Sequence, residues 1–222
     1  MDRSVVLRTP IALIVFVIGI VITVWLGTSE NLKCLIQGKH APADAAQFHG
    51  TGEIYFVPIG DFPRSTLEDL GRYYEQKYRL TIHITSAVPP NASAYNPERR
   101  QWAAEDLVAS VNRSSISSSG AADPVMIAFT DQDLYIREFQ WRYAFGRWDD
   151  SGVAVLSSAR MSYPWLGFVK VSQTRRDARL RKMVTRYIGH LYYKLPFNDE
   201  CQSVLYRNIG GPQELDFMGE DL

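Results

Sequence analysis

The sequence predicts an α/β fold, in which a sheet is packed by helices. Short apolar runs bounded by turn residues alternate along the chain with segments whose apolar residues recur at helical spacing. The chain has 222 residues, of which 46% are hydrophobic, so it can form one good-sized domain with appendages.

The first two expected elements follow one another closely. EIYFVPIG, residues 53–60, is a short apolar run that ends at a proline and a glycine, which predicts a strand. Residues 62–79 carry leucines and tyrosines at helical spacing, and Ser65 or Thr66 is the expected cap of this helix.

A second strand and helix are expected next. LTIHIT, residues 80–85, alternates between apolar and polar residues and predicts a strand, with His83 on one face in a structural role. A proline-rich loop, 87–97, separates this strand from an amphipathic helix over 98–114.

The second half predicts two more strands and a long helix. PVMIAFT, 124–130, reads as a buried strand, 130–152 as a loop and hairpin, and 153–161 as another strand. A helix over about 173–194 is expected to close the core, and the tail 195–222 shows little regular periodicity.

The N-terminal stretch from Thr9 to Ser29 contains no charged residue. Its 21 residues are enough for a helix to cross the hydrocarbon core of a bilayer. Arg3 and Arg8 precede it, which favours a cytoplasmic N-terminus. We therefore expect an uncleaved signal-anchor that contacts membrane lipid, with a cleaved signal peptide as the alternative reading.

These observations define a domain organisation. We expect a cytoplasmic tip at 1–8, a transmembrane helix at 9–29, a linker at 30–52 and a folded domain at 53–222. In either reading of the N-terminus, the domain is expected outside the cytoplasm, on the periplasmic or extracellular side of a single-pass membrane protein.

Charge and cysteine content exclude several classes of protein. Basic and acidic residues balance, 24 against 24, so nothing indicates a nucleic-acid partner. Two cysteines cannot build a disulfide scaffold or a cysteine-rich zinc module. Cys34 and Cys201 pair only in an oxidising compartment, and free thiols are the open alternative.

Five stretches carry a resemblance to a known family. They are IYFVPIGDF (54–62), YNPERRQWAAEDLVASV (95–111), VMIAFTDQDLYI (125–136), WRYAFGRW (141–148) and VAVLSSARM (153–161). In this order and spacing they resemble the archaemetzincin family, a branch of the metzincin zinc peptidases, over roughly residues 53–222. The resemblance implies a metzincin-like sheet packed by helices and a zinc peptidase ancestor.

The family's last helix carries H-E-x-x-H-x-x-G-x-x-H, whose histidines bind zinc and whose glutamate acts as general base. With the frame anchored on His190, this sequence keeps only that one ligand position. Arg186 and Pro196 replace the other two histidines, Tyr187 occupies the general-base position and Tyr193 the glycine position.

These replacements argue against zinc chemistry. A guanidinium keeps its proton above about pH 12 and has no lone pair to offer, and a phenol has a pKa near about 10. We expect no catalytic residue, no metal and no cofactor, with zinc only if the family function is retained. The leading hypothesis is an inactive pseudopeptidase that binds a peptide or protein ligand or acts as a scaffold. An active zinc metallopeptidase and a purely structural membrane protein are the alternatives.

Two readings of the helix remain. Its apolar stripe predicts a core-facing helix with Tyr187 as a packing residue and His190 on the flank; the stripe comprises Leu180, Met183, Val184, Tyr187, Ile188 and Leu191. Alternatively, Arg186 and His190 form an anion or ligand site one helical turn apart. The candidate anion is the carboxylate of a ligand, such as a peptide C-terminus, or of an acid in this chain, namely Asp131, Asp133, Asp199 or Glu200.

Two polar segments are interpreted structurally. In TDQDLY, residues 130–135, Asp131 and Asp133 are expected to cap a turn through nearby backbone N–H groups. The basic run RRDARLRK, 175–182, is expected to form a solvated helix face, with anionic lipid or a partner protein as the alternative.

Overall fold

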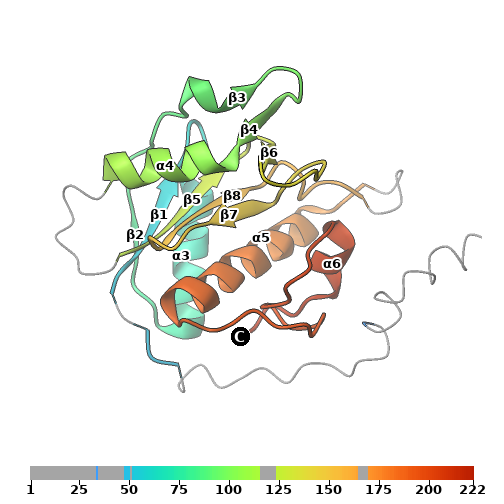
Figure 1. Cartoon of the computed structure of the whole chain (residues 1–222). Helices are drawn as coiled ribbons and strands as arrows, with labels where there is room; N and C mark the ends of the chain where they lie inside the picture. Colours follow the sequence, from blue (N-terminus) through green and yellow to red (C-terminus); the bar gives the residue numbers. More distant parts are fainter. Residues whose placement is uncertain (1–33, 35–47, 51, 116–123, 165–169) are drawn as a thin grey trace, which may run out of the picture. The chain divides into compact units, whose positions relative to one another are not determined.

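The structure is a computed structural model, and it describes Cys34 and residues 48–50, 52–115, 124–164 and 170–222 (Figure 1). The chain divides into two compact units, Met1–His40 and Ala41–Leu222, and the architecture below is that of the second unit. The predicted transmembrane helix, 9–29, lies outside the described residues. In the part that is described, no helix is long and apolar enough to cross a membrane.

A five-stranded sheet forms the centre of the domain, in the order β2-β1-β5-β8-β7. Four of its strands are parallel, and β7 runs antiparallel to β8 at one edge. The strands are β1 (Ile54–Pro58), β2 (Ile82–Ile84), β5 (Val125–Thr130), β7 (Gly146–Trp148) and β8 (Val153–Ser157). A cleft opens beside the antiparallel edge strand β7.

A small second sheet and the helices surround this centre. The three-stranded sheet has the order β3-β4-β6, with β3 at Tyr95–Asn96, β4 at Gln101–Ala103 and β6 at Leu134–Tyr135. The helices are α3 (Arg64–Tyr78), α4 (Ala104–Ser115), α5 (Gln173–Tyr187) and α6 (Pro212–Phe217), with a 3-10 turn at Ala92–Ala94.

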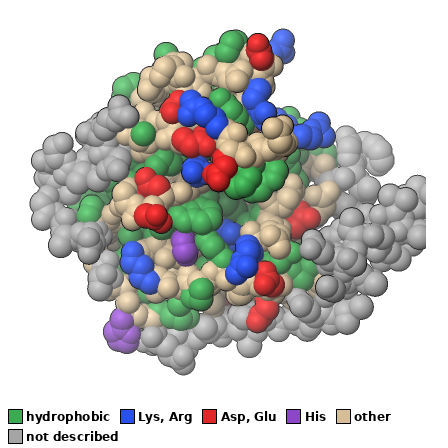
Figure 2. Space-filling view, in the orientation of Figure 1, with side chains coloured by type: hydrophobic (Ala, Val, Ile, Leu, Met, Phe, Trp, Pro, Cys, Tyr) green, Lys and Arg blue, Asp and Glu red, His purple; other side chains and the backbone are tan. Residues whose placement is uncertain are grey.

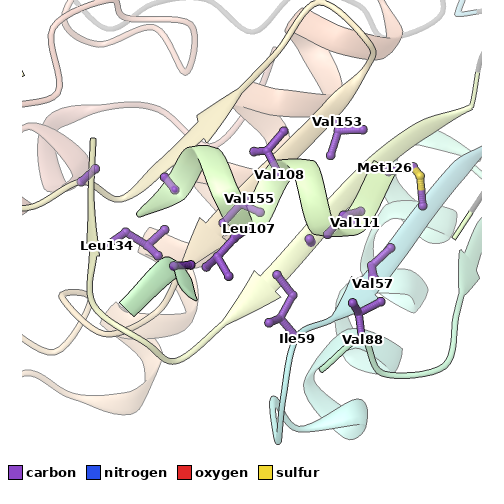
Figure 3. Packing of buried hydrophobic residues seen from close by; sticks show 14 of the residues in the cluster. Val57, Ile59, Val88, Leu107, Val108, Val111, Met126, Leu134, Val153 and Val155 are labelled. Atoms are coloured by element: carbon purple, nitrogen blue, oxygen red, sulfur yellow. The ribbon is translucent and has the colours of Figure 1, made fainter. Parts of the chain in front are cut away.

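Helices cover both faces of the main sheet. Helix α4 lies over one face, and α3 and α5 lie over the other (Figure 1). Side chains alternate along the strands, so Val57 and Val155 face Leu107 and Val111 of α4 in one buried cluster (Figure 3). On the opposite face, the Phe56 ring packs edge-on against Tyr74 of α3 with the centroids 6.3 Å apart.

The predicted mixed α/β fold is therefore confirmed, and most predicted elements appear close to their expected bounds. The cap predicted at Ser65 or Thr66 is wrong, because α3 begins after Pro63 and no side chain caps it. The helix predicted from residue 98 begins only at Ala104. The residues before it are held extended as β4, in which the Trp102 amide donates to the Asp133 carbonyl at 2.8 Å.

The C-terminal tail is more ordered than its weak periodicity suggests. It contains helix α6, which starts with Pro212 in the first turn, a position where proline's missing N–H leaves no helical bond unmade. Lys182 of α5 donates to the Leu215 carbonyl at 2.7 Å, so this tail covers the outer side of α5.

Candidate functional site

A cleft of about 650 Å³ opens at the β7 edge of the main sheet. Three chain segments line it. The first is residues 140–146 with Trp148, which lead into and belong to β7; the second is Met183, Arg186 and Tyr187 near the end of α5; the third is residues 207–210. This volume lies within the range typical of small-molecule and peptide-side-chain pockets. The cleft is the natural place to examine the residues that the sequence singled out.

Helix α5 places Arg186 and Tyr187 at the cleft. The Ser172 hydroxyl caps its N-terminus by accepting from the Arg175 amide at 3.3 Å. The predicted stripe is confirmed, since all six of its residues are buried. After Tyr187 the chain continues as a π-helical turn, Ile188–Tyr192, a feature that often occurs at functional sites.

Arg186 is a buried cation at the cleft wall. The residue is only 5% exposed. Its guanidinium donates one hydrogen bond to the Tyr206 carbonyl and another, 3.5 Å long, to the Arg207 carbonyl. The guanidinium carbon lies 4.0 Å from the centroid of the Phe197 ring. Burial lowers the pKa of Arg186 from 12.5 to about 10. Among the described residues, no carboxylate forms an ion pair with it.

Tyr187 fills the space between α5 and the edge strand. It is 1% exposed, and a Cβ built on Gly146 of β7 would lie 2.6 Å from its hydroxyl oxygen. Burial raises the pKa of this phenol further above its usual value, so it remains protonated at neutral pH. It is therefore a packing residue that cannot act as a base there.

His190 lies in the π-helical turn, beside the cleft rather than among its lining residues. Its Nδ1 is 3.0 Å from the Leu195 carbonyl oxygen, which can only accept, so Nδ1 carries the proton. Its ring stacks on Phe197 with the centroids 4.1 Å apart. The Phe197 ring thus contacts both His190 and Arg186.

The side chains at the three positions where the resemblance places zinc ligands do not fit a zinc ion. One is a guanidinium held by carbonyl groups, one is the half-buried His190, and Pro196 lies exposed in the loop that follows. Within residues 48–50, 52–115, 124–164 and 170–222, together with Cys34, no cluster of three or more histidine, cysteine or acidic side chains is placed to hold a metal. Zinc needs neutral imidazole, thiolate or carboxylate donors, which a guanidinium cannot replace.

A polar network that the sequence reasoning missed lies next to the cleft. Arg160 forms a two-bond ion pair with Asp133, one bond being Nε to Oδ1 at 2.8 Å. Gln101 Nε2 donates to Asp133 at 2.9 Å and to the Arg142 carbonyl at 2.8 Å. Arg99 Nε donates in turn to the Gln101 side chain at 2.9 Å. The network joins β4, the 130–135 turn and the segment that leads into β7.

The turn prediction for Asp133 is therefore wrong. Its carboxylate binds two side chains, and the Thr130 hydroxyl instead accepts from the Gln132 amide at 3.1 Å within the turn. Asp131 is exposed, and the Gln132 side chain donates to it at 2.9 Å. The signal in the sequence was the pairing of D-x-D-L-Y with S-x-x-R, but sequence alone does not say that the two segments meet.

The solvated face predicted for 175–182 is wrong in part. Arg179 is fully buried and forms two bonds to Asp216, at 2.8 and 2.7 Å, and two more to backbone carbonyls. Arg181 pairs with Glu220. Burial lowers the pKa of Lys182. The tail after residue 211 supplies these carboxylates and covers the helix.

Two other sequence predictions have simple outcomes. His83 lies in β2 and stacks on Tyr55 with the ring centroids 5.1 Å apart, which agrees with a structural role. Cys34 and Cys201 are both disulfide-bonded.

Comparison with known proteins finds similarity to archaemetzincins. No protein-family model matches the chain. A curated archaemetzincin from Natronomonas pharaonis is 27% identical over 137 residues, which span 60% of this chain and 75% of that protein. This sequence similarity supports a relation to the archaemetzincin family.

Three solved structures share the archaemetzincin fold with this chain, each over 76% of its length. The archaemetzincin from Methanopyrus kandleri is 18% identical with 88% of its chain covered, and the one from Archaeoglobus fulgidus, complexed with malonate, is 20% identical with 94% covered; the TM-score is 0.59 for both. A zinc-dependent peptidase from Methanocorpusculum labreanum is 17% identical with 94% of its chain covered and a TM-score of 0.61. At these identities the likeness extends to the fold, and residues of this chain must be judged by their own geometry.

Proposed function

We propose that this chain is a catalytically inactive, membrane-anchored relative of the archaemetzincins that binds a peptide or protein ligand in the β7 cleft. The observation that carries the proposal is Arg186, a cation in the cleft wall at the position where the resemblance places a zinc ligand. A fixed positive charge there repels a divalent cation and attracts an anion.

The lack of a base supports inactivity. Tyr187 stands at the general-base position, and its burial keeps it protonated at neutral pH. A neutral phenol does not remove a proton from water, whereas the carboxylate of a metzincin does. The retained cleft and the edge strand beside it support a binding role, because an open strand edge and a pocket together suit an extended chain.

Metal content tests the proposal directly. Full-length protein is purified in zinc-containing buffer, and its bound metal is measured by mass spectrometry beside the zinc-dependent peptidase from Methanocorpusculum labreanum as a positive control. We expect well under one zinc per chain and no chelator-sensitive peptide hydrolysis. Near-stoichiometric zinc with activity lost on chelation would establish the alternative, an active zinc metallopeptidase, which the fold of that relative favours.

Ligand binding separates the proposal from a purely structural membrane protein. Full-length protein in detergent micelles is screened against a library of short synthetic peptides by fluorescence anisotropy. We expect a subset to bind and to compete for one site. A protein that binds no member of the library would have no receptor role of this kind.

The membrane anchor and the extracytoplasmic location are part of the same proposal. The uncharged stretch 9–29 supports the anchor, and the two disulfide-bonded cysteines support an oxidising compartment. We expect full-length protein in the membrane fraction after carbonate washing, and a variant lacking residues 1–29 in the soluble fraction. Recovery of both proteins in the same fraction would refute the anchor.

A further inference from the structure

Three arginines on α5 differ in how their charges are compensated. Arg179, fully buried, is bound by both oxygens of Asp216, and Arg181 is paired with Glu220. Arg186 is almost as buried as Arg179, yet its described hydrogen-bond partners are the carbonyls of Tyr206 and Arg207. Thus Arg179, a buried guanidinium of α5, has a carboxylate partner from the tail. Arg186, on the same helix but at the cleft, has no carboxylate partner among the described residues.

An uncompensated buried charge is unfavourable, so its position has to be explained. Moving a charge out of water is costly unless an opposite charge compensates it. Carbonyl dipoles and the Phe197 ring offset part of this cost but add no negative charge. A guanidinium has five N–H donors, and two carbonyl partners leave donors for another group.

The rest of the cleft has the same electrostatic character. Its described lining residues include Arg142 and Arg207 as well as Arg186, and none of them is acidic. Arg207 lies 3.9 Å from Asp199, an exposed pair that weakly reduces its charge. A concave site lined by one sign of charge concentrates ligands of the opposite sign. On the face shown in Figure 2, basic and acidic side chains are interspersed.

Aromatic walls complete the site. Five aromatic residues line the cleft: Trp141, Tyr143, Phe145, Trp148 and Tyr187. Trp141 is 54% exposed. Such rings favour an apolar or aromatic group next to the anion. A carboxylate fits the planar fork of an arginine better than a spherical anion does, because it accepts two parallel N–H bonds.

We infer that the β7 cleft recognises a carboxylate through Arg186, and that the ligand is the C-terminal end of a peptide with an aromatic last residue. This inference rests on the proposed function and names its ligand class. An acidic side chain within a peptide carries the same chemical group, so the experiment must separate the two sources.

Three synthetic peptides provide that separation. They are acetyl-Ala-Ala-Phe with a free carboxylate, the same peptide as its C-terminal amide, and acetyl-Ala-Glu-Phe amide, which carries its carboxylate on a side chain. Binding to full-length protein in micelles is measured by calorimetry and by fluorescence of Trp141 and Trp148 in the cleft. We expect the free acid to bind about tenfold to a hundredfold more tightly than the amide, with the glutamyl amide close to the amide.

Variants at the same position show whether Arg186 is responsible. Arg186→Gln is expected to bind acid and amide equally, and Arg186→Lys to keep part of the preference because it keeps the charge. Arg72→Gln, which removes an exposed arginine from α3, is the matched control and is expected to behave as wild type. Thermal melting of each variant verifies that it is folded, and Arg207→Gln, at the exposed side of the cleft, offers a second test with a smaller loss.

The outcomes distinguish the inference from the proposed function. Equal binding of the acid and both amides, or an unchanged preference in folded Arg186→Gln, would overturn carboxylate recognition while leaving peptide binding intact. Tighter binding of the glutamyl amide would overturn the C-terminal assignment. Absence of binding by all three peptides and by the larger library would refute the inference together with the proposed receptor role.

Discussion

The guanidinium of Arg160 is bound by both carboxylate oxygens of Asp133 and lies between two tyrosine rings, 4.8 Å from the centroid of Tyr143 and 4.7 Å from that of Tyr163. Through Gln101 the pair also holds the backbone of Arg142. Four segments that carry the archaemetzincin resemblance therefore meet around one ion pair. This relationship fixes the strip of chain that forms one wall of the cleft.

Arg160→Gln is expected to destabilise the fold by about 2 kcal/mol, because it leaves a largely buried carboxylate without its cation. The side chains of Arg160 and Asp133 are 23% and 19% exposed, so water compensates part of the loss. The free energy of unfolding is measured by urea titration. Arg137→Gln is the matched control, since Arg137 also binds an aspartate, Asp106, but is 48% exposed; its loss is expected below about 1 kcal/mol. Equal losses in the two variants would contradict a structural role for the Asp133 network.

Gly146→Ala is expected to cost about 1–3 kcal/mol, because the new methyl group would collide with the Val155 carbonyl and lie 2.6 Å from the Tyr187 hydroxyl. Adding Tyr187→Phe removes the second collision and is expected to restore part of the stability. Gly210→Ala, where nothing lies within 4 Å of the added carbon, is expected to change stability by less than about 0.5 kcal/mol. Unfolding titrations of the four proteins test this order, and no recovery in the double variant would mean that Tyr187 does not pack against β7.

Local patterns explain how much of this structure could be predicted. The strands β1, β5 and β8 are short continuous apolar runs, buried along almost their whole length, and the stripe on α5 recurs at helical spacing; both patterns can be read locally. The Asp133–Arg160 pair and the covering of Arg179 by Asp216 join residues 27 and 37 positions apart. Such contacts depend on the tertiary fold, so the composition of each segment alone favoured a turn cap and a solvated face.

In the candidate site, too, some features follow from local sequence patterns and others depend on the tertiary fold. The assignment of Arg186 to a zinc-ligand position follows only from the spacing of the family motif that the sequence resembles. The contacts of Phe197 with both Arg186 and His190 could not be predicted in this way, because they depend on how the chain turns after the π-helical turn.

Stability is expected to fall as the pH falls through the acid range because of Glu220. Burial alone would raise the pKa of this carboxyl, but hydrogen bonds from Arg181 and Tyr73 and nearby positive charges together lower it below its usual 4.5. A pKa that is lower in the folded state gives stability that is complete above the unfolded value and is lost as the pH falls through the folded value. Unfolding titrations between about pH 3 and 7 measure this slope.

Glu220→Gln is the control for that prediction. It is expected to be less stable than wild type at neutral pH and to show a shallower acid dependence, since the amide does not titrate. Glu68→Gln, which changes an exposed acid of α3, should leave the slope unchanged. A wild-type slope in Glu220→Gln would assign the acid sensitivity to other groups.

Arg186→Met is expected to leave the fold as stable as wild type or to stabilise it, whereas Arg179→Met is expected to lose about 3–5 kcal/mol. The reason is that Arg179 neutralises Asp216, and its removal leaves a carboxylate uncompensated, while Arg186 has no described acid to leave behind. The lowered pKa of Arg186, about 10, has the same cause, since burial disfavours its charged form. Urea titration at neutral pH compares the two variants.

A loss for Arg186→Met as large as that for Arg179→Met would mean that Arg186 is kept for stability. The expected difference would instead mean that the fold tolerates an unfavourable charge at the cleft, which is what a residue retained to bind an anion requires.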